Sequence, residues 1–128
     1  MVDTQHVILI IEDDHDTLDF LVLFFSAEGY LVRVANTRET ALSILQKFEA
    51  PDVILTDWHM PGMSIDTFVN EVRRVDPQLD ILLLSAYKEV VNDKARELGL
   101  DFIRKPPDLT DLQRRVRTSI QKRREMRG

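Results

Sequence analysis

Polar side chains stand at the ends of the apolar runs in this sequence. Three acidic residues follow the first run, and one acidic residue ends the third. A serine ends the fourth run, and a lysine follows the fifth. In chain order these residues are Glu12, Asp13, Asp14, Asp57, Ser85 and Lys105. Carboxylates that converge on one place repel one another strongly, and a bound cation relieves this repulsion.

The chemistry that suits such a set is metal-assisted phosphoryl transfer. Mg2+ is usually held by one or two carboxylates together with waters and phosphate oxygens. Lys105 would add a second positive charge, and Ser85 would add a hydroxyl donor. Cations and donors around one carboxylate favour phosphoryl transfer, in which positioning and charge neutralisation supply most of the catalysis. That carboxylate would be the nucleophile and would form an aspartyl phosphate.

The residues are positioned by apolar runs of strand length that alternate with amphipathic segments of helix length. The expected strands are Val7–Ile11, Leu31–Ala35, Asp52–Asp57, Ile81–Ser85 and Asp101–Arg104. The first, third and fourth are nearly continuous in valine, isoleucine and leucine. Such runs are typical of parallel strands that are covered on both faces.

Five helices are expected between and after these strands. The first follows Asp14 and stops at Gly29, a residue type common just past a helix end. The second has Asn36 as its expected N-cap, with Glu39 three residues later in a capping-box pattern. The remaining helices are expected over Ile65–Val75, over Lys88–Leu98 and from about Asp108 onward.

This alternation predicts an α/β fold of the form (βα)5, with one layer of parallel sheet and helices on both faces. Right-handed crossovers leave few topologies for such a chain. Ligands of open α/β sheets bind outside the carboxyl ends of the strands. Since the candidate residues all follow or end strands, the sequence predicts that they meet at that edge.

Length and composition exclude several other classes. The chain has 128 residues, the usual size of one domain, and no cysteine for a disulfide or a thiolate metal site. That composition fits a cytoplasmic protein. The longest apolar run, Phe20–Phe25, is far shorter than the roughly 20 residues that span a bilayer. We therefore expect no membrane segment, and the polar start indicates no signal peptide.

The net charge of −5 is unevenly distributed along the chain. From Arg104 onward there are nine basic residues and three acidic ones. A basic end can indicate nucleic-acid binding, but no aromatic residue is interleaved here. We interpret the segment as a solvated helix with cations near its C-terminal end, where they are favourable, and expect no direct nucleic-acid binding.

Four motifs resemble those of receiver domains from bacterial two-component response regulators. They are Ile8–Asp14, Asp52–Gly62, the pair Ser85-Ala86 and the pair Lys105-Pro106. Their order and spacing match the family over nearly the whole chain, and the four together are highly specific. The resemblance implies the flavodoxin-like receiver fold, a doubly wound parallel sheet with the strand order 2-1-3-4-5.

The resemblance also implies a role for each acidic residue of the set. Asp57 looks like the phosphoacceptor. Asp13 resembles the direct ligand of a bound Mg2+ or Mn2+, and Glu12 resembles its partner, which acts through metal-bound water. The main-chain oxygen of His59 is the further metal ligand that the family pattern implies, and its imidazole is not expected to bind the metal.

Three more residues match positions that respond to the phosphoryl group. Lys105 matches the lysine that binds it, Ser85 the hydroxyl residue that moves toward it, and Phe102 the aromatic switch position. The peptide between Lys105 and Pro106 is expected to be cis, as cis peptides are nearly confined to bonds before proline. Tyr87 is expected near the entrance of the site.

The chain departs from the family pattern before the third helix. Family members commonly have a glycine and then an apolar residue where this sequence has Ile65 and Asp66. Glycine often supplies a positive φ at such a turn, and isoleucine tolerates that conformation badly. We therefore expect altered geometry in this loop and at the start of the helix. Pro107, where an aromatic residue is frequent, is a milder variation.

The implied function is signalling rather than enzymatic turnover of a substrate. A sensor histidine kinase or a phosphotransfer protein would donate the phosphoryl group, and the domain would catalyse only its own phosphotransfer and self-dephosphorylation. The signal would pass to a partner or to an output domain beyond residue 128, with phosphorylation-dependent dimerisation as an option. We expect one receiver domain over 1–128, with its core over 5–122 and a basic tail or linker over 123–128.

Two other functions fit parts of this pattern. Aspartyl phosphatases of the haloacid dehalogenase type also have a nucleophilic aspartate at a strand end. They usually carry a second aspartate two residues later, where this chain has His59. An interaction module that does not need phosphate is the other alternative, although it would not require the complete set of candidate site residues.

Overall fold

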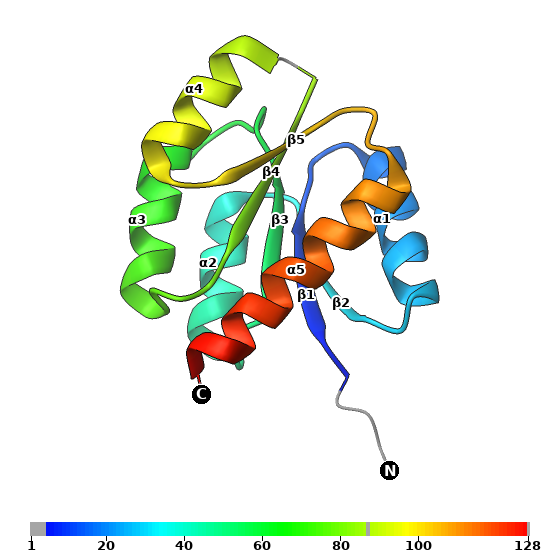
Figure 1. Cartoon of the computed structure of the whole chain (residues 1–128). Coiled ribbons are helices and arrows are strands. Elements are labelled where there is room, and N and C mark those ends of the chain that lie inside the picture. Colours follow the sequence, from blue (N-terminus) through cyan, green and yellow to red (C-terminus); the bar gives the residue numbers. More distant parts are fainter. Residues whose placement is uncertain (1–4, 87, 128) are drawn as a thin grey trace.

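The computed structural model describes residues 5–86 and 88–127, without the side chains of 88–91 and 127. Five parallel strands form one sheet in the order β2-β1-β3-β4-β5, which confirms the expected topology. The strands are β1 (Val7–Ile11), β2 (Leu31–Ala35), β3 (Val53–Asp57), β4 (Ile81–Ser85) and β5 (Asp101–Arg104). The helices are α1 (His15–Ala27), α2 (Arg38–Lys47), α3 (Ile65–Val75), α4 (Lys88–Leu98) and α5 (Leu109–Arg127). Figure 1 shows α5 crossing in front of the sheet.

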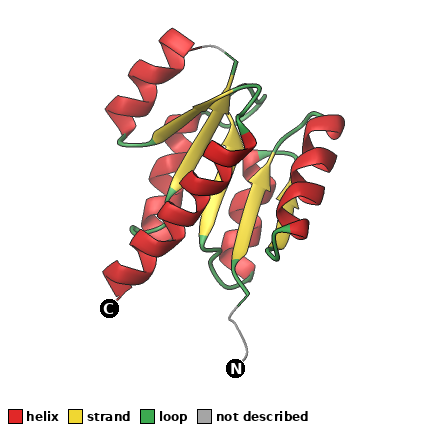
Figure 2. Cartoon of the chain, turned by 45° about the vertical axis from the view of Figure 1, so that its right-hand side comes forward, coloured by secondary structure: helices red, strands yellow, loops and turns green. Residues whose placement is uncertain are grey.

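Helices cover both faces of the sheet, as Figure 2 shows. In β1, Ile8 and Ile10 pack with the buried residues of α1 and α5, among them Phe25. Leu9 and Ile11 pack with the buried residues of α2, α3 and α4. Because side chains alternate between the faces of a strand, a strand covered on both sides is apolar at every position. This explains the unbroken apolar run that predicted β1.

The order of the strands makes the carboxyl ends of β1 and β3 a topological switch point. β1 lies between β2 and β3, and α1 and α2 lie on opposite faces of the sheet. Ile11 of β1 lies beside Thr56 of β3, so the following residues, Glu12 and Asp57, reach the same edge. Such a topological switch point is the usual ligand site of open α/β sheets.

The predicted cap of α2 was wrong by one residue. The N-cap is Thr37 rather than Asn36, and the Thr37 hydroxyl accepts a hydrogen bond from the Thr40 amide at 3.0 Å. Both residue types are good caps, so the pattern alone did not distinguish them. The expected capping box does not form either. The Glu39 carboxylate instead accepts a hydrogen bond from the amide of Met63, at 3.3 Å, in the loop before α3.

The expected disturbance at Ile65 does not occur. Ser64 caps α3 in an extended conformation, and Ile65 is the buried first residue of the helix. Gly62 provides the positive φ of this loop, at 90°, and no non-glycine residue has a positive φ in the described chain. Asp66 lies in the first turn and forms an ion pair with Lys94 of α4, with 2.8 Å between Oδ2 and Nζ. The positive φ of the loop therefore lies at Gly62, three residues before Ile65, and the start of α3 is regular.

α5 extends past residue 122, where we expected the core to end. It continues to Arg127, and Arg123 is only 3% exposed. The guanidinium Nη2 of Arg123 lies 2.6 Å from Oδ2 of Asp76, just after α3. The expected tail is therefore helical as far as Arg127 and is attached to the amino end of the sheet. Of the helices in the described chain, none has the length and apolar character needed to cross a membrane.

Candidate functional site

The structure brings Glu12, Asp57 and Lys105 together at the carboxyl edge of the sheet. The Lys105 ammonium lies 3.0 Å from Oδ1 of Asp57 and 3.2 Å from Oε2 of Glu12. These residues follow or end β1, β3 and β5, so the backbone of three strands fixes their relative positions. The amide of Lys105 is held as well, since it donates to the Ser85 carbonyl oxygen at 2.8 Å.

Burial and charge act together on the groups of this site. Glu12 is 1% exposed and Asp57 is 7% exposed. Burial, with the charge of Asp57, raises the pKa of Glu12 above its ordinary value despite the opposing effect of Lys105. Burial alone would lower the pKa of Lys105, but its hydrogen bonds and charge interactions with Asp57 and Glu12 outweigh this and raise it. Lys105 therefore remains a cation throughout the neutral pH range.

Three carboxylates lie close enough together to hold one divalent cation. One oxygen from each of Glu12, Asp13 and Asp57 lies within 4.8 Å of the others. Asp13 is exposed while the other two are buried, so a cation would enter from the side of Asp13. Glu12 and Asp57 contact Lys105, and an all-oxygen donor set of this kind suits Mg2+ or Mn2+. Asp14 takes no part in this set and caps α1, as its side chain accepts from the Thr17 amide.

Ser85 and Phe102 lie where the sequence placed them, on β4 and β5. Ser85 is buried at the end of β4 beside Arg104 of β5. Phe102 is half-buried and packs against the core beneath α2, α3 and α4. The peptide between Lys105 and Pro106 is cis, as predicted. Phe102 pairs with Leu83, two residues before Ser85 on β4.

His59 is an exposed residue of the loop that follows β3. Its imidazole is not part of the carboxylate group, which comprises Glu12, Asp13 and Asp57 among the described residues. The position of Tyr87 lies outside the described residues.

Sequence reasoning missed Arg38, a residue in direct contact with the site. Its side chain is buried, and its Nη2 donates to the main-chain oxygens of Asp57 and Trp58 at 3.0 and 2.9 Å. Nη1 donates to the main-chain oxygen of Met63 at 2.9 Å. Arg38 stands three, four and seven residues before Ala41, Leu42 and Leu45, so the helical period already places it on the buried face of α2. This signal was missed because arginine is rarely buried.

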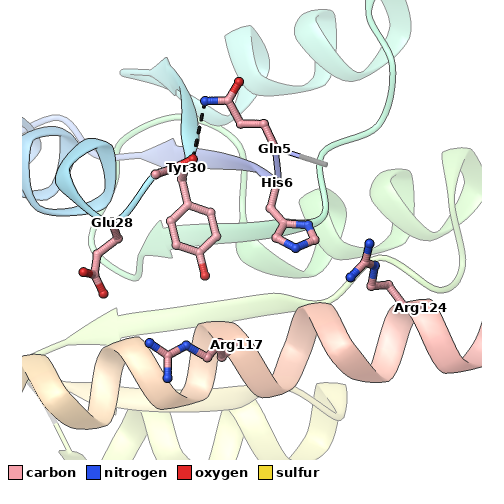
Figure 3. Close-up of a pocket in the computed structure, with 7 residues that line it drawn as sticks. Gln5, His6, Glu28, Tyr30, Arg117 and Arg124 are labelled. Carbon is pink, nitrogen blue, oxygen red and sulfur yellow. Dashed lines mark hydrogen bonds between the residues drawn. The ribbon is translucent and has the colours of Figure 1, made fainter. Parts of the chain in front are cut away.

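Two grooves lie at opposite ends of the strands. The first, of about 480 Å3, adjoins Lys105 and is mainly apolar. Its lining consists of Asp16, Thr17, Phe20, Leu21, Leu84, Ala86, Lys105, Pro106 and Pro107. The second, of about 790 Å3, lies between Tyr30 and α5, with Arg117 and Arg124 on the helix (Figure 3). This second groove is polar. Neither groove is lined by Glu12, Asp13 or Asp57, but the first includes Lys105, which contacts Asp57.

Comparisons with known proteins identify the family of this chain. The sequence model of the response regulator receiver domain matches residues 8–117. The chain is 30% identical over 112 residues to sporulation initiation phosphotransferase F of Bacillus subtilis, covering 86% of this chain and 90% of that protein. It is 31% identical to regulatory protein AtoC of Escherichia coli over 89% of this chain, which spans only 25% of AtoC. The crystal structure of a putative response regulator from Chloroflexus aurantiacus superimposes with a TM-score of 0.83 at 31% identity, covering 92% and 99% of the two chains.

Proposed function

Because the chain belongs to the response regulator receiver domain family, we propose that it signals by accepting a phosphoryl group on Asp57. The observation that carries this proposal is the contact of Asp57 Oδ1 with the Lys105 ammonium beside two further carboxylates. A buried nucleophilic carboxylate needs cations around it when a phosphoryl group arrives, and this site offers one cation and a donor set for another.

The proposed donor is a phosphohistidine of a sensor histidine kinase or a phosphotransfer protein. An oxygen of the Asp57 carboxylate attacks phosphorus, the bond from phosphorus to the imidazole nitrogen breaks, and the imidazole leaves with the electron pair. An acyl phosphate results. Lys105 neutralises charge on the transferred group, and attack by water later releases inorganic phosphate and restores the carboxylate.

Asp13, Asp57 and the main-chain oxygen of His59 would hold Mg2+ or Mn2+, with Glu12 acting through a metal-bound water. The cation would neutralise charge on the phosphoryl oxygens. Support comes from the three carboxylate oxygens within 4.8 Å and from the exposure of Asp13.

The proposed response runs through Ser85 and Phe102. A phosphoryl group offers new acceptor oxygens near the Ser85 hydroxyl, and its movement would leave space for Phe102 to turn. The face formed by α4, β5 and α5 would change as a result. The output would be a partner or a further domain, as in relatives such as AtoC, of which this chain spans a quarter. The apolar groove beside Lys105 would receive the donor protein.

A labelling experiment with acetyl phosphate and Mg2+ tests the assignment of Asp57. Intact mass should increase by one phosphoryl group in the wild type and in the Asp19→Asn control, in which an exposed acid of α1 is replaced. The Asp57→Asn variant keeps the size of the side chain and should remain unmodified. Equal labelling of that variant would refute the assignment. Sustained hydrolysis of p-nitrophenyl phosphate by the wild type would favour the phosphatase alternative instead.

A further inference from the structure

Arg38 is a buried cation that contacts main-chain oxygens rather than a carboxylate. It is 3% exposed, in the first turn of α2. Among the described residues its guanidinium has no ion-pair partner, and three carbonyl oxygens accept its hydrogen bonds. Its Nε has no hydrogen-bond partner. Burial lowers the pKa of Arg38 below its ordinary value, although the charges of Asp57 and Glu39 oppose this.

A buried guanidinium is expensive, so its hydrogen bonds must repay the loss of water. The three acceptors belong to the segment that runs from the phosphoacceptor to α3. Asp57 and Trp58 stand at its start and Met63 near its end. Arg38 thus ties both ends of this loop to α2 through one planar group, for which the fork of an arginine is well suited.

Glu39 makes a second connection between α2 and the same loop. Its carboxylate accepts a hydrogen bond from the Met63 amide at 3.3 Å and lies beside Gly62, where an added Cβ would come within 2.7 Å of Oε2. The first turn of α2 therefore contacts the loop through two adjacent side chains. The carbonyl of His59 lies between the two attachment points along the chain.

We propose that Arg38 is a positioning residue for the phosphorylation site. By binding the main-chain oxygens of Asp57, Trp58 and Met63, it fixes the direction of the Asp57 side chain and of the loop that carries the His59 carbonyl. This inference rests on the proposed function, because it concerns the cation that the site would hold. Groups that orient metal ligands without touching the metal typically change metal affinity by about 10- to 100-fold when they are replaced.

The sign of the effect separates positioning from simple charge. A nearby cation repels Mg2+, so if Arg38 acted only through its charge, its removal would strengthen Mg2+ binding. If Arg38 acts by holding the loop, its removal weakens Mg2+ binding. The two accounts therefore predict changes of opposite direction in one measured quantity.

The test measures Mg2+ binding by calorimetry in the wild type, Arg38→Met and Arg33→Met. Arg33 of β2 also donates to a main-chain oxygen, that of Glu49 at 2.7 Å, so its replacement makes the same change of charge away from the site. We expect Arg38→Met to bind Mg2+ about tenfold more weakly and Arg33→Met to bind as the wild type does. The Mg2+ concentration for half-maximal labelling by acetyl phosphate should rise in parallel.

Wild-type or tighter Mg2+ binding by folded Arg38→Met would overturn the inference. If circular dichroism shows that this variant does not fold, Arg38→Lys decides, because it keeps the charge but loses the planar fork. At least about threefold weaker binding by Arg38→Lys would support positioning, and wild-type binding would refute it. A wild type that neither binds Mg2+ nor becomes labelled would refute the proposed function itself, which is a different outcome.

Discussion

The ion pair of Asp76 and Arg123 provides a test of how a buried charge stabilises this fold. The Arg123 side chain is 2% exposed and the Asp76 side chain is 14% exposed, with 2.6 Å between Nη2 and Oδ2. Replacement of Asp76 by asparagine leaves a guanidinium that water cannot reach. Replacement of Arg123 by methionine leaves a carboxylate that is partly hydrated and still accepts from the Gln78 amide at 3.1 Å.

The two replacements should therefore lower the free energy of unfolding by different amounts. Breaking a buried pair by removing one partner costs about 3–5 kcal/mol. We expect Asp76→Asn to lower the free energy of unfolding by about 3 kcal/mol, at the low end of this range, because the amide oxygen can still accept a hydrogen bond from Arg123. Arg123→Met should lower the free energy of unfolding by only about 1–2 kcal/mol, since methionine keeps much of the apolar stem and the Asp76 carboxylate, partly exposed, keeps its bond from the Gln78 amide. The double variant should resemble Arg123→Met, because it has no unpaired buried charge.

Urea unfolding followed by circular dichroism and by Trp58 fluorescence measures these differences. With a slope of about 2 kcal/mol/M, Asp76→Asn should lower the midpoint by about 1.5 M. Arg124→Met is the matched control, since Arg124 is an exposed neighbour on the same helix, and it should unfold nearly as the wild type does. An Arg123→Met variant at least as unstable as Asp76→Asn, with unchanged slope, would show that the buried unpaired cation does not determine the cost.

Three further predictions concern the site. Asp13→Asn should weaken Mg2+ binding at least about tenfold in calorimetry, since even residues that only orient a metal ligand change metal affinity by that much. Unchanged affinity would show that Asp13 is not a ligand. Ser85→Ala should still become labelled on Asp57. The changes that a phosphoryl mimic causes in the amide NMR shifts of α4 and α5 should be smaller than in the wild type, because one hydrogen bond to a charged group is worth about 1.5–3 kcal/mol. Equal changes in both proteins would show that the switch does not depend on Ser85. Lys105→Met should bind Mg2+ at least about fivefold more tightly, because Lys105 and Mg2+ would contact the same carboxylates and their repulsion is worth about 1 kcal/mol or more. Its phosphorylation by acetyl phosphate should nevertheless be slower. Weaker Mg2+ binding would contradict this competition.

The strands and the edge where the candidate residues meet could be predicted from the sequence. A parallel strand covered on both faces is apolar at every position, so β1, β3 and β4 are visible as runs of valine, isoleucine and leucine. Residues that follow such strands share one edge whatever the details of the helices. The strand pattern and the family resemblance were therefore enough to predict that Glu12, Asp57 and Lys105 lie close together.

The residues that escaped prediction are charged side chains on helices. Arg38 and Arg123 lie on the buried faces of their helices by the helical period, but their charge argued against burial, and both contact distant segments. The acceptors of Arg38 are main-chain oxygens, which have no signature in sequence. Glu39 was assigned to a local capping box, yet its carboxylate contacts Met63 of another loop. Local rules described the helix correctly and could not reveal which loop would pack against it.

The two cations at the site differ in what they contact, and this difference sets their effects on metal binding. Lys105 contacts the side-chain oxygens of Asp57 and Glu12, which a divalent cation would also use. Arg38 contacts main-chain oxygens of the loop and no described carboxylate. On the proposals above, removal of Lys105 would relieve competition with the metal, whereas removal of Arg38 would release the loop that carries the His59 carbonyl. Opposite changes of Mg2+ affinity in Lys105→Met and Arg38→Met would distinguish a charge that binds the phosphoryl group from a charge that holds the backbone in place.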